Sequence, residues 1–338
     1  MVRRLPTTNL RLFSRRLNTV SSSSSSIAAG SRLSKPEPAA PTIVDLDDPR
    51  KLFSSVSTSK FLRSLVNLGL VANETFVDFG MWVMNSRLVE TTLVRDVILK
   101  TVKHTMFEHF CAGETTEEAG QCARKIHEAG LRGMLAYAVE HTSDNNTCDR
   151  NLEGFIRSVD FSKSLPPSSK CVDLNIPLTI DAEDTSLQPA IDYFTYSSAI
   201  MYNKDGNAIV YGTIQAYLKD AKERLFTASK TADKLGIPMG FKLVRGAYMS
   251  SETRVASRFG FDSPIHDSID KTHSCYDECA SFMLERIANG NDAVVLATHN
   301  LQSGKLAALK ARNMGIRKGN PKLEFAQLYG CQKLYRLV

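Results

Sequence analysis

Polar side chains follow six short apolar runs from residue 133 onward, at or near the point where each run ends. The groups concerned are Glu140-His141, Asp181-Ala182-Glu183-Asp184, Gln215, Arg245-Gly246, Thr298-His299-Asn300, and Glu324 with Gln327. Carboxylates, imidazoles and cationic groups can exchange protons, bind anions or tune a cofactor. One such coincidence is weak evidence, because polar residues often cap the following helix. Six in succession predict a shared site at one edge of a sheet.

The apolar runs predict strands, and the stretches between most of them predict amphipathic helices. The expected strands are Met134–Val139, Ile176–Ile180, Ile209–Thr213, Phe241–Val244, Ala293–Ala297 and Leu323–Phe325. The expected helices are Tyr217–Leu235, Ile265–Ala288 and Gln302–Met314. Strands that alternate with helices imply parallel pairing through right-handed crossovers. The polar strand ends favour a (βα)-barrel over an open doubly wound sheet, for which the G-x-G-x-x-G signature is also missing after every strand. Six strands are fewer than the eight of a complete barrel, so two are hidden or the sequence is incomplete.

The N-terminal part has a different composition. Residues 1–35 contain seven basic residues and no acidic one, and they include the serine run Ser21–Ser26. This composition is typical of a mitochondrial transit peptide. A Pro-rich linker is expected at 36–48, and a mainly helical region at 49–130. The helices expected in that region are Ser57–Leu70, Thr91–Phe110 and Glu117–Ala129, from apolar residues at three- and four-residue spacing.

Charge and cysteine usage exclude several classes of function. The net charge of +6 is concentrated in the first 35 residues, so the remainder is close to neutral and nucleic-acid binding is not expected. The seven cysteines include no CxxC pair, which is consistent with buried thiols in a reducing compartment. His104 and His109 lack partners at zinc-site spacing, so no metal site is expected.

Several ordered motifs together resemble those of one enzyme family. They are Phe107–Gly113 (FEHFCAG), Gly133–His141 (GMLAYAVEH), Leu178–Asp184 (LTIDAED), Gln215–Tyr217 (QAY), Phe241–Tyr248 (FKLVRGAY), Ala297–Asn300 (ATHN) and Glu324–Gly330 (EFAQLYG). Taken in this order they are similar to the proline dehydrogenase family, and the first two to its plant mitochondrial branch. The similarity extends from Pro49 to Gly330. The resemblance implies a distorted (βα)8 TIM-like barrel, incomplete here at 131–330 and preceded by N-terminal helices, with an atypical tail at 331–338.

The resemblance also implies an activity and its partners. Members oxidise L-proline to Δ1-pyrroline-5-carboxylate with FAD and pass the electrons to a membrane quinone. They work in proline catabolism in the mitochondrion, on the matrix side of the inner membrane, with peripheral membrane contact. Three positions match active-site residues of the family. Lys242 matches a basic residue near the flavin N5, Asp181 an active-site carboxylate, and Tyr248 an aromatic residue beside the proline pocket.

Further positions match residues that hold FAD in the family. Arg245, Gly246 and Ala247 match a loop beside the pyrophosphate, where a glycine lets the backbone approach and an arginine grips phosphate oxygens. Gln215 matches a side chain at the isoalloxazine edge. Thr298, His299 and Asn300 match a cluster around the ribityl and pyrophosphate groups. Thr272 matches a hydroxyl near the adenosine half.

The sequence departs from the family pattern in two places. Only 36 residues separate Val139 from Ile176, too few for a strand, helix and linker that the family has there. After Gly330, the family continues to a strand and a helix with two arginines and a glutamate, which this sequence does not contain. An unclosed barrel exposes sheet edges and core, so poor folding, weak FAD retention and little turnover are expected. Two other hypotheses stay open: an inactive remnant that acts as an interaction partner or FAD competitor, and an aldolase-like barrel that uses Lys242 as a Schiff-base amine.

Overall fold

The structure is a computed structural model of the 338-residue chain. It describes residues 57–128, 131–138, 144–162 and 177–330, together with the backbone of 9–15. Within these ranges, no helix is both long and apolar enough to cross a membrane. Glu140-His141, the connection before Ile176, and the tail at 331–338 lie outside the described residues.

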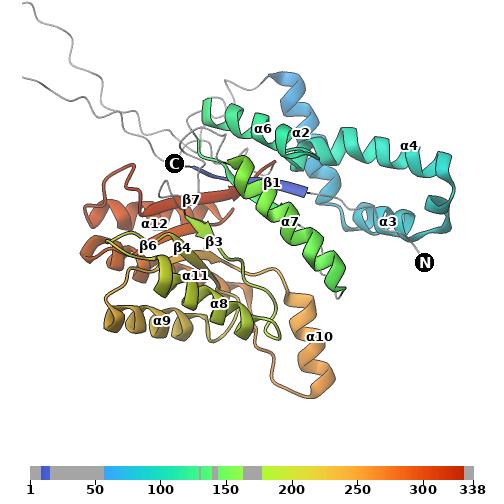
Figure 1. The fold of residues 1–338 in the computed structure, drawn as a ribbon. Helices are drawn as coiled ribbons and strands as arrows, with labels where there is room; N and C mark the ends of the chain where they lie inside the picture. The colour runs from blue at the N-terminus through green and yellow to red at the C-terminus, as the bar shows by residue number, and fades with distance from the viewer. Residues whose placement is uncertain (1–8, 16–56, 129–130, 139–143, 163–176, 331–338) are drawn as a thin grey trace, which may run out of the picture.

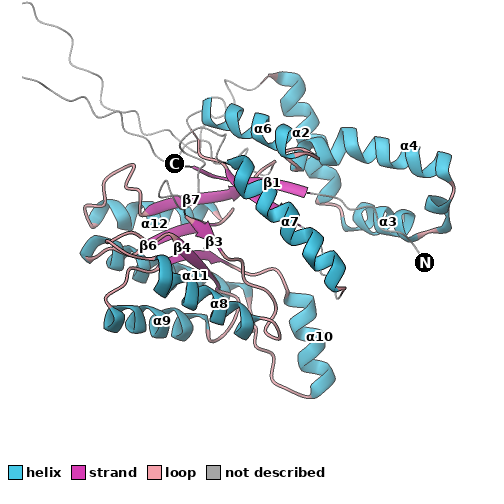
Figure 2. Cartoon of the chain, in the orientation of Figure 1, coloured by secondary structure: helices cyan, strands magenta, loops and turns pink. Residues whose placement is uncertain are grey.

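A curled, mainly parallel sheet forms the centre of the molecule (Figures 1 and 2). Its five parallel strands are β3 (Leu178–Thr179), β4 (Val210–Gln215), β5 (Gly240–Val244), β6 (Ala293–Ala297) and β7 (Leu323–Leu328). Each pairs with the next in sequence order. This arrangement is a distorted, incomplete (βα)8-like barrel, as the sequence analysis predicted.

Two further strands extend the sheet beyond β7. Strand β2 (Met134–Ala138) was predicted, whereas β1 (Asn9–Arg15) was not and comes from the stretch expected to be a transit peptide. Strand β1 lies between β2 and β7 and runs antiparallel to both, so β2 runs in the same direction as β7. The resulting strand order is β2-β1-β7-β6-β5-β4-β3. No pairing joins β2 to β3 in the described part of the chain, so the barrel is open there.

Helices lie between the strands along the chain, and most of them cover the outer face of the sheet (Figure 1). They are α7 (Asn145–Ser162), α8 (Gln188–Tyr202), α9 (Ala221–Leu235), α10 (Met249–Phe259), α11 (Ile269–Asn289) and α12 (Leu301–Asn313). Helices α8, α9 and α11 pack beside strands β4–β6 and α12 packs beside α11, while α10 projects from the body (Figure 1). Helices α7, α8 and α10 were not predicted. Helix α9 begins at Ala221 rather than Tyr217, and α11 begins at Ile269 rather than Ile265, because Leu218 and Ile265 instead form a β-bridge.

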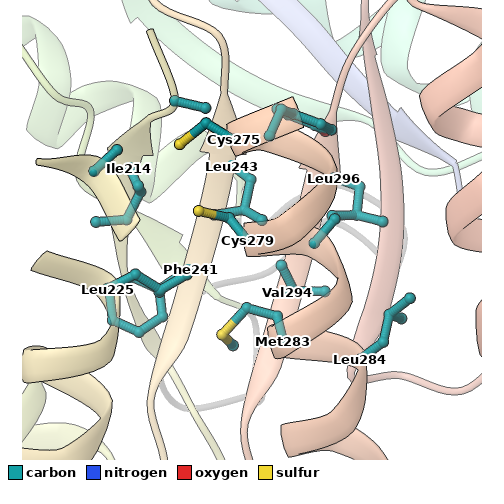
Figure 3. Packing of buried hydrophobic residues seen from close by; sticks show 14 of the residues in the cluster. Ile214, Leu225, Phe241, Leu243, Cys275, Cys279, Met283, Leu284, Val294 and Leu296 are labelled. Carbon is teal, nitrogen blue, oxygen red and sulfur yellow. The ribbon is translucent and has the colours of Figure 1, made fainter. Parts of the chain in front are cut away.

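Side chains alternate between the two faces of the strands, as a pleated backbone requires. Phe241 and Leu243 of β5 point outward and are fully buried against helix α11, with Cys279 and Met283 around them (Figure 3). Lys242, between Phe241 and Leu243 in sequence, therefore points to the inner face. A second buried cluster on that inner face contains Tyr211, Ala293, Val295 and Ala326. The sheet thus buries its outer face under helices and carries Lys242 inside the curl.

The N-terminal helices form an arm that extends beside the sheet (Figure 1). They are α2 (Thr58–Val71), α3 (Glu74–Asn85), the 3-10 turn η1 (Arg87–Glu90), α4 (Thr92–Val102), the π-helical turn η2 (Lys103–Phe107) and α5 (Glu108–Phe110). Helix α6 (Thr116–Glu128) follows the arm and packs beside β1 and α7. The single helix predicted over Thr91–Phe110 is thus interrupted by η2.

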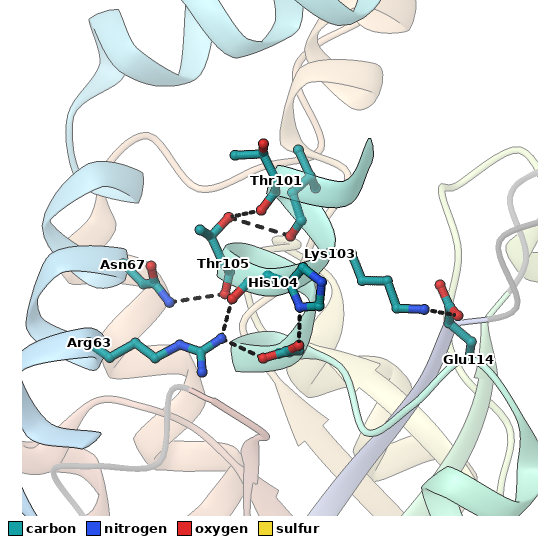
Figure 4. Close-up of polar contacts among 9 residues, drawn as sticks. Arg63, Asn67, Thr101, Lys103, His104, Thr105 and Glu114 are labelled. Carbon is teal, nitrogen blue, oxygen red and sulfur yellow. Dashed lines mark hydrogen bonds and ion pairs between the residues drawn. The ribbon is translucent and has the colours of Figure 1, made fainter. Parts of the chain in front are cut away.

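Polar contacts join the two ends of this arm. Arg63 of α2 lies 2.6 Å from the Glu108 carboxylate and also donates to the carbonyl of His104 (Figure 4). Asn67 donates to the carbonyl of Thr105 over 3.1 Å. These bonds satisfy backbone carbonyls around η2, where the regular helical ladder is altered.

Candidate active site

The carboxyl ends of the parallel strands meet at one edge of the sheet. Asp181 follows β3, Gln215 ends β4, Arg245 follows β5, and Thr298 follows β6. We call this edge the rim. Parallel pairing brings these groups together, as the sequence analysis predicted for a barrel. Glu324 differs, because it is the second residue of β7 and lies at the opposite end, where it pairs with Arg132.

Lys242 and Asp181 form an ion pair on the inner side of the sheet. The Lys242 ammonium donates to the Asp181 carboxylate, and their side chains are 16% and 66% exposed. Burial lowers the pKa of Lys242 from 10.5 to about 8. Asp181 favours the charged form of the lysine, but water screens this largely exposed carboxylate, so desolvation prevails. The rim therefore contains an amine that can gain or lose a proton near neutral pH.

Arg245 connects three secondary-structure elements. Its Nε donates to Nδ1 of His273 on α11 over 2.9 Å, and its two terminal nitrogens donate to Thr298 Oγ1 over 2.6 Å and to Ser303 Oγ over 2.8 Å. The guanidinium also lies 4.4 Å from the ring centroid of Tyr276. Hydrogen bonds at its edge and an aromatic ring at its face hold the guanidinium in one plane.

The Thr298-His299-Asn300 segment forms the start of α12. Asn300 caps the helix by accepting from the backbone N–H of Ser303 over 3.1 Å, and its own N–H donates to Thr298 Oγ1 over 3.0 Å. His299 Nε2 accepts from the backbone N–H of Leu328 over 3.2 Å, which ties the segment to β7. Burial lowers the pKa of His299, which favours the neutral ring that this acceptor role requires. Gln327, expected just beyond the last strand, lies inside β7 and donates to the carbonyl of Thr298.

Gly246 allows a close approach of two backbone segments at the rim. Its φ angle is 133°, which side-chain-bearing residues rarely adopt, and a Cβ there would collide with the ring of Tyr217. The N–H of Tyr217 donates to the carbonyl of Arg245 over 2.7 Å. Ala247 follows in the same turn and is exposed. Glycine is therefore required here by packing within the protein, in addition to any approach of a ligand.

Gln215 and Tyr248 both contact the loop that follows β3. The buried Gln215 amide donates to the carbonyl of Glu183 over 2.8 Å. Burial and the hydrogen-bonded carboxylate of Glu183 raise the pKa of Tyr248, so its phenol stays protonated. The same loop is held by the buried Glu252 of α10, which accepts from the N–H and hydroxyl of Thr185 over 2.7 and 2.6 Å. The start of α10 is thereby fixed to the loop that follows β3.

Thr272 is the predicted site residue that is least available to a ligand. It is 4% exposed, and its hydroxyl donates back to the carbonyl of Ser268 within α11, over 3.5 Å. The neighbouring His273 makes the contact with Arg245 instead. Sequence reasoning missed His273, Ser303 and Glu252. The three-residue spacing of His273 and Tyr276 predicts that they share a helix face, but it does not show which way that face points.

A family model described as proline dehydrogenase matches residues 111–336. The chain is 43% identical over 371 residues to proline dehydrogenase 1, mitochondrial, of Arabidopsis thaliana, covering 85% of this chain and 74% of that one. It is 41% identical over 382 residues to proline dehydrogenase 2, mitochondrial, of the same plant, covering 88% and 80% of the two chains. The chain belongs to the proline dehydrogenase family. This family membership was predicted from the ordered motifs and is confirmed.

A solved bacterial structure shares the fold. Proline utilization A from Bdellovibrio bacteriovorus, inactivated by N-propargylglycine, superimposes with a TM-score of 0.68 at 21% identity. The match covers 85% of this chain and 37% of the bacterial one. The fold is therefore shared over most of this chain.

Proposed function

We propose that the chain carries the FAD-dependent oxidation of L-proline to Δ1-pyrroline-5-carboxylate, with electrons passed to a quinone. The observation that carries this proposal is the arrangement of the rim. A largely buried lysine on β5 lies beside a carboxylate, and the arginine that follows this strand is fixed by Thr298, α11 and α12. These groups face one edge of a barrel in a chain of the proline dehydrogenase family.

The residues at the rim fit a flavin dinucleotide. Arg245 is planar and held in one orientation, which suits bidentate binding of a phosphate group. Thr298, Asn300 and the Gly246-Ala247 turn lie next to it, so the pyrophosphate is assigned to this part of the rim. Lys242 and Gln215 lie on neighbouring strands β5 and β4, and they are assigned to the isoalloxazine. Thr272 would reach the adenosine half only if its hydroxyl left the helical carbonyl.

The substrate groups lie next to the assigned flavin position. A bound flavin would accept a hydride from the carbon next to the proline nitrogen. Lys242, with a pKa of about 8, is mostly charged at neutral pH and can stabilise negative charge that develops beside it. Asp181 holds Lys242 and is exposed to the substrate side. Tyr248 is assigned to the wall of the proline pocket, as its contact with the Glu183 loop fixes the ring there.

We also propose that this chain lacks an internal segment that its relatives have. The alignment with the first Arabidopsis relative spans 371 positions, more than the 338 residues of this chain, so that relative carries residues without a counterpart here. We infer that they include the strand, helix and linker expected between Val139 and Ile176. The open sheet between β2 and β3 is consistent with this assignment. An incomplete barrel holds FAD less firmly than a closed one, because fewer walls exclude water from it.

The proposed location, the mitochondrion, is inferred from the relatives and from the N-terminal segment. The Arabidopsis proteins are named mitochondrial, and the acid-free basic segment at 1–35 agrees with import into that organelle. The matrix side of the inner membrane, with peripheral membrane contact, is the place where a quinone acceptor is accessible.

A visible spectrum tests the proposal. The full chain is purified with FAD, and L-proline is added without oxygen. The proposal expects the oxidised flavin band to bleach and to recover on adding a short-chain ubiquinone, and Lys242→Met to slow the bleaching. Inserting the segment that the Arabidopsis relative has between Val139 and Ile176 should speed it. Absence of proline-dependent bleaching even after this insertion would overturn the proposal.

The same experiment also tests the two other hypotheses, each of which one observation favours. The open sheet favours the inactive remnant, which would bind FAD without bleaching. An aldolase-like enzyme needs a lysine with a lowered pKa, and no sequence motif predicted one. Burial of Lys242 lowers its pKa, which favours this hypothesis. Trapping of a carbonyl substrate on Lys242 by borohydride, in a chain that shows no proline-dependent bleaching, would identify that activity instead.

A further inference from the structure

His273 lies on α11 beside the guanidinium of Arg245, and no role was predicted for it. Its Nδ1 is 2.9 Å from Arg245 Nε, while the ring of Tyr276, one helical turn further on, lies under the same guanidinium. Residues three apart in a helix share a face. One face of α11 therefore gives Arg245 both a hydrogen-bond acceptor at its edge and an aromatic surface beneath it.

The bond to Arg245 determines the protonation of the imidazole. An arginine Nε–H can only donate, so Nδ1 of His273 has no proton, and the neutral ring has its single proton on Nε2. Nε2 lies 3.5 Å from Asn300 Nδ2. The orientation of that amide is set by its oxygen, which accepts from the Ser303 N–H. Two N–H donors therefore face each other, and neither can satisfy the other.

We propose that His273 is a positioning residue that holds Arg245, through its neutral ring, in the orientation that binds the cofactor diphosphate. The inference rests on the proposed function, in which FAD occupies the rim. Thr298 and Ser303 also accept from Arg245, but hydroxyl groups rotate to follow a moving partner. The lone pair of His273 has a direction fixed by the ring and by α11. His273 and Asn300 also present their N–H groups to an oxygen of the same ligand.

Removing the acceptor has a specific consequence. Without His273 Nδ1, Arg245 Nε loses its hydrogen-bond acceptor and the guanidinium can rotate about the side-chain bonds. The diphosphate then binds to a less ordered arginine. We expect FAD affinity to fall about tenfold, as for the loss of one charge-assisted hydrogen bond. Riboflavin has no phosphate, so its affinity should not change. A role confined to folding would weaken both ligands alike.

The experiment compares FAD and riboflavin dissociation constants, from flavin fluorescence, in four forms of the full chain. They are the wild type, His273→Phe, His273→Asn and Ser274→Ala, the last being an exposed neighbour on the same helix. The expected result is a selective loss of FAD affinity in His273→Phe and recovery in His273→Asn, whose side-chain oxygen can accept from Arg245. The Ser274→Ala control should match the wild type. Thermal midpoints without flavin report on folding.

Equal FAD affinity in His273→Phe and wild type would overturn the inference, as would a parallel loss of riboflavin or a failure of His273→Asn to recover binding. If His273→Phe does not fold, His273→Leu replaces it, because leucine is smaller and also lacks a hydrogen-bond acceptor. It is judged by the same ratio of FAD to riboflavin dissociation constants. If the wild-type chain binds neither ligand, the four forms are compared with the Arabidopsis segment inserted between Val139 and Ile176. A chain that binds neither ligand even then would overturn the proposed function itself, which separates that failure from a failure specific to His273.

Discussion

The strand–helix body at 177–330 and the arm at 57–110 are both rich in apolar residues, yet they bury them very differently. In the body, Phe241, Met283 and Leu284 are completely buried. In the arm, no residue of α3 is buried, although Phe, Val, Met and Trp make up most of this helix. Phe79 and Trp82 stack on each other at 58% and 60% exposure. The buried residues of α2 are polar, Ser64 and Asn67.

The difference shows that an apolar helix needs a partner surface as well as an apolar composition. In the body, each crossover returns the helix to the sheet, so its apolar face is covered by the strands on either side. In the arm, Arg63 and Asn67 of α2 make polar contacts with the segment around η2. An exposed ion pair such as Arg63–Glu108 orders the backbone but contributes little to stability. The body should therefore determine the stability of the molecule.

The largest effect is expected for a phenylalanine in the body. Phe241→Ala removes a fully buried ring from the cluster beneath α11, and we expect the free energy of unfolding to fall by about 3–5 kcal/mol. Phe79→Ala in the arm removes a ring that is 58% exposed, and should cost less than about 1 kcal/mol. Urea unfolding followed by circular dichroism measures both. Equal losses would mean that the arm buries Phe79 against another surface in solution.

The sequence predicted the buried strands better than the exposed helices, for a physical reason. Periodicity located β4, β5 and β6 closely, because a strand covered by helices is apolar along most of its length. It missed α8, whose Tyr193 and Phe194 are exposed and so break any one-sided apolar stripe. It did not predict β1 either, since pairing between residues 9–15 and β2 is a long-range contact with no local signal.

The candidate site shows the same division. Lys242, Arg245 and Thr298 were found because strand ends and family motifs mark them along the chain. Their grouping could be predicted, since parallel strands end at one edge. His273 could not be found in this way, because its role depends on how far α11 is rotated about its axis. Only the packing of Tyr276 against Arg245 defines that rotation.

A pH series on Lys242 is expected to give the next largest effect. Burial lowers the pKa of Lys242 to about 8, so the folded chain loses this proton before the unfolded chain, whose lysine titrates near 10.5. Between these pH values the unfolded state binds more protons, and wild-type stability rises with pH. Lys242→Met should therefore raise the free energy of unfolding at pH 7 by up to about 3 kcal/mol, with the gain disappearing as pH approaches 10.5.

Lys103 in the arm is the matched control for this series. It is exposed, and a hydrogen bond from its ammonium to Glu114 raises its pKa. Lys103→Met should not raise the free energy of unfolding at pH 7, and its effect should not change between pH 8 and 10.5. Urea midpoints at half-unit pH steps measure both variants. A pH-independent effect of Lys242→Met would show that Asp181 keeps this lysine charged throughout.

A glycine at the rim should give a smaller loss. Gly246→Ala places a Cβ against the Tyr217 ring at a φ angle of 133°, so both the contact and the backbone conformation become unfavourable. Strain of this kind costs about 1–3 kcal/mol. Because Tyr217 bonds to the carbonyl of Arg245, the change should also displace that arginine and weaken FAD binding more than riboflavin binding. Thermal midpoints and flavin titrations measure the two effects, and an unchanged midpoint would mean that the turn relaxes freely.

The same substitution in the arm should have the opposite sign. Gly80 lies inside α3, and a Cβ there would meet nothing within 4 Å. Alanine restricts the unfolded chain and favours the helix, so Gly80→Ala should stabilise α3 by about 0.5–1 kcal/mol. If the arm unfolds separately from the body, this gain will appear as slower amide exchange in α3 and leave the exchange of β4 and β5 unchanged. Slower exchange in both regions would instead show that arm and body unfold as one cooperative unit, because a local change in helix propensity can reach β5 only through a shared transition.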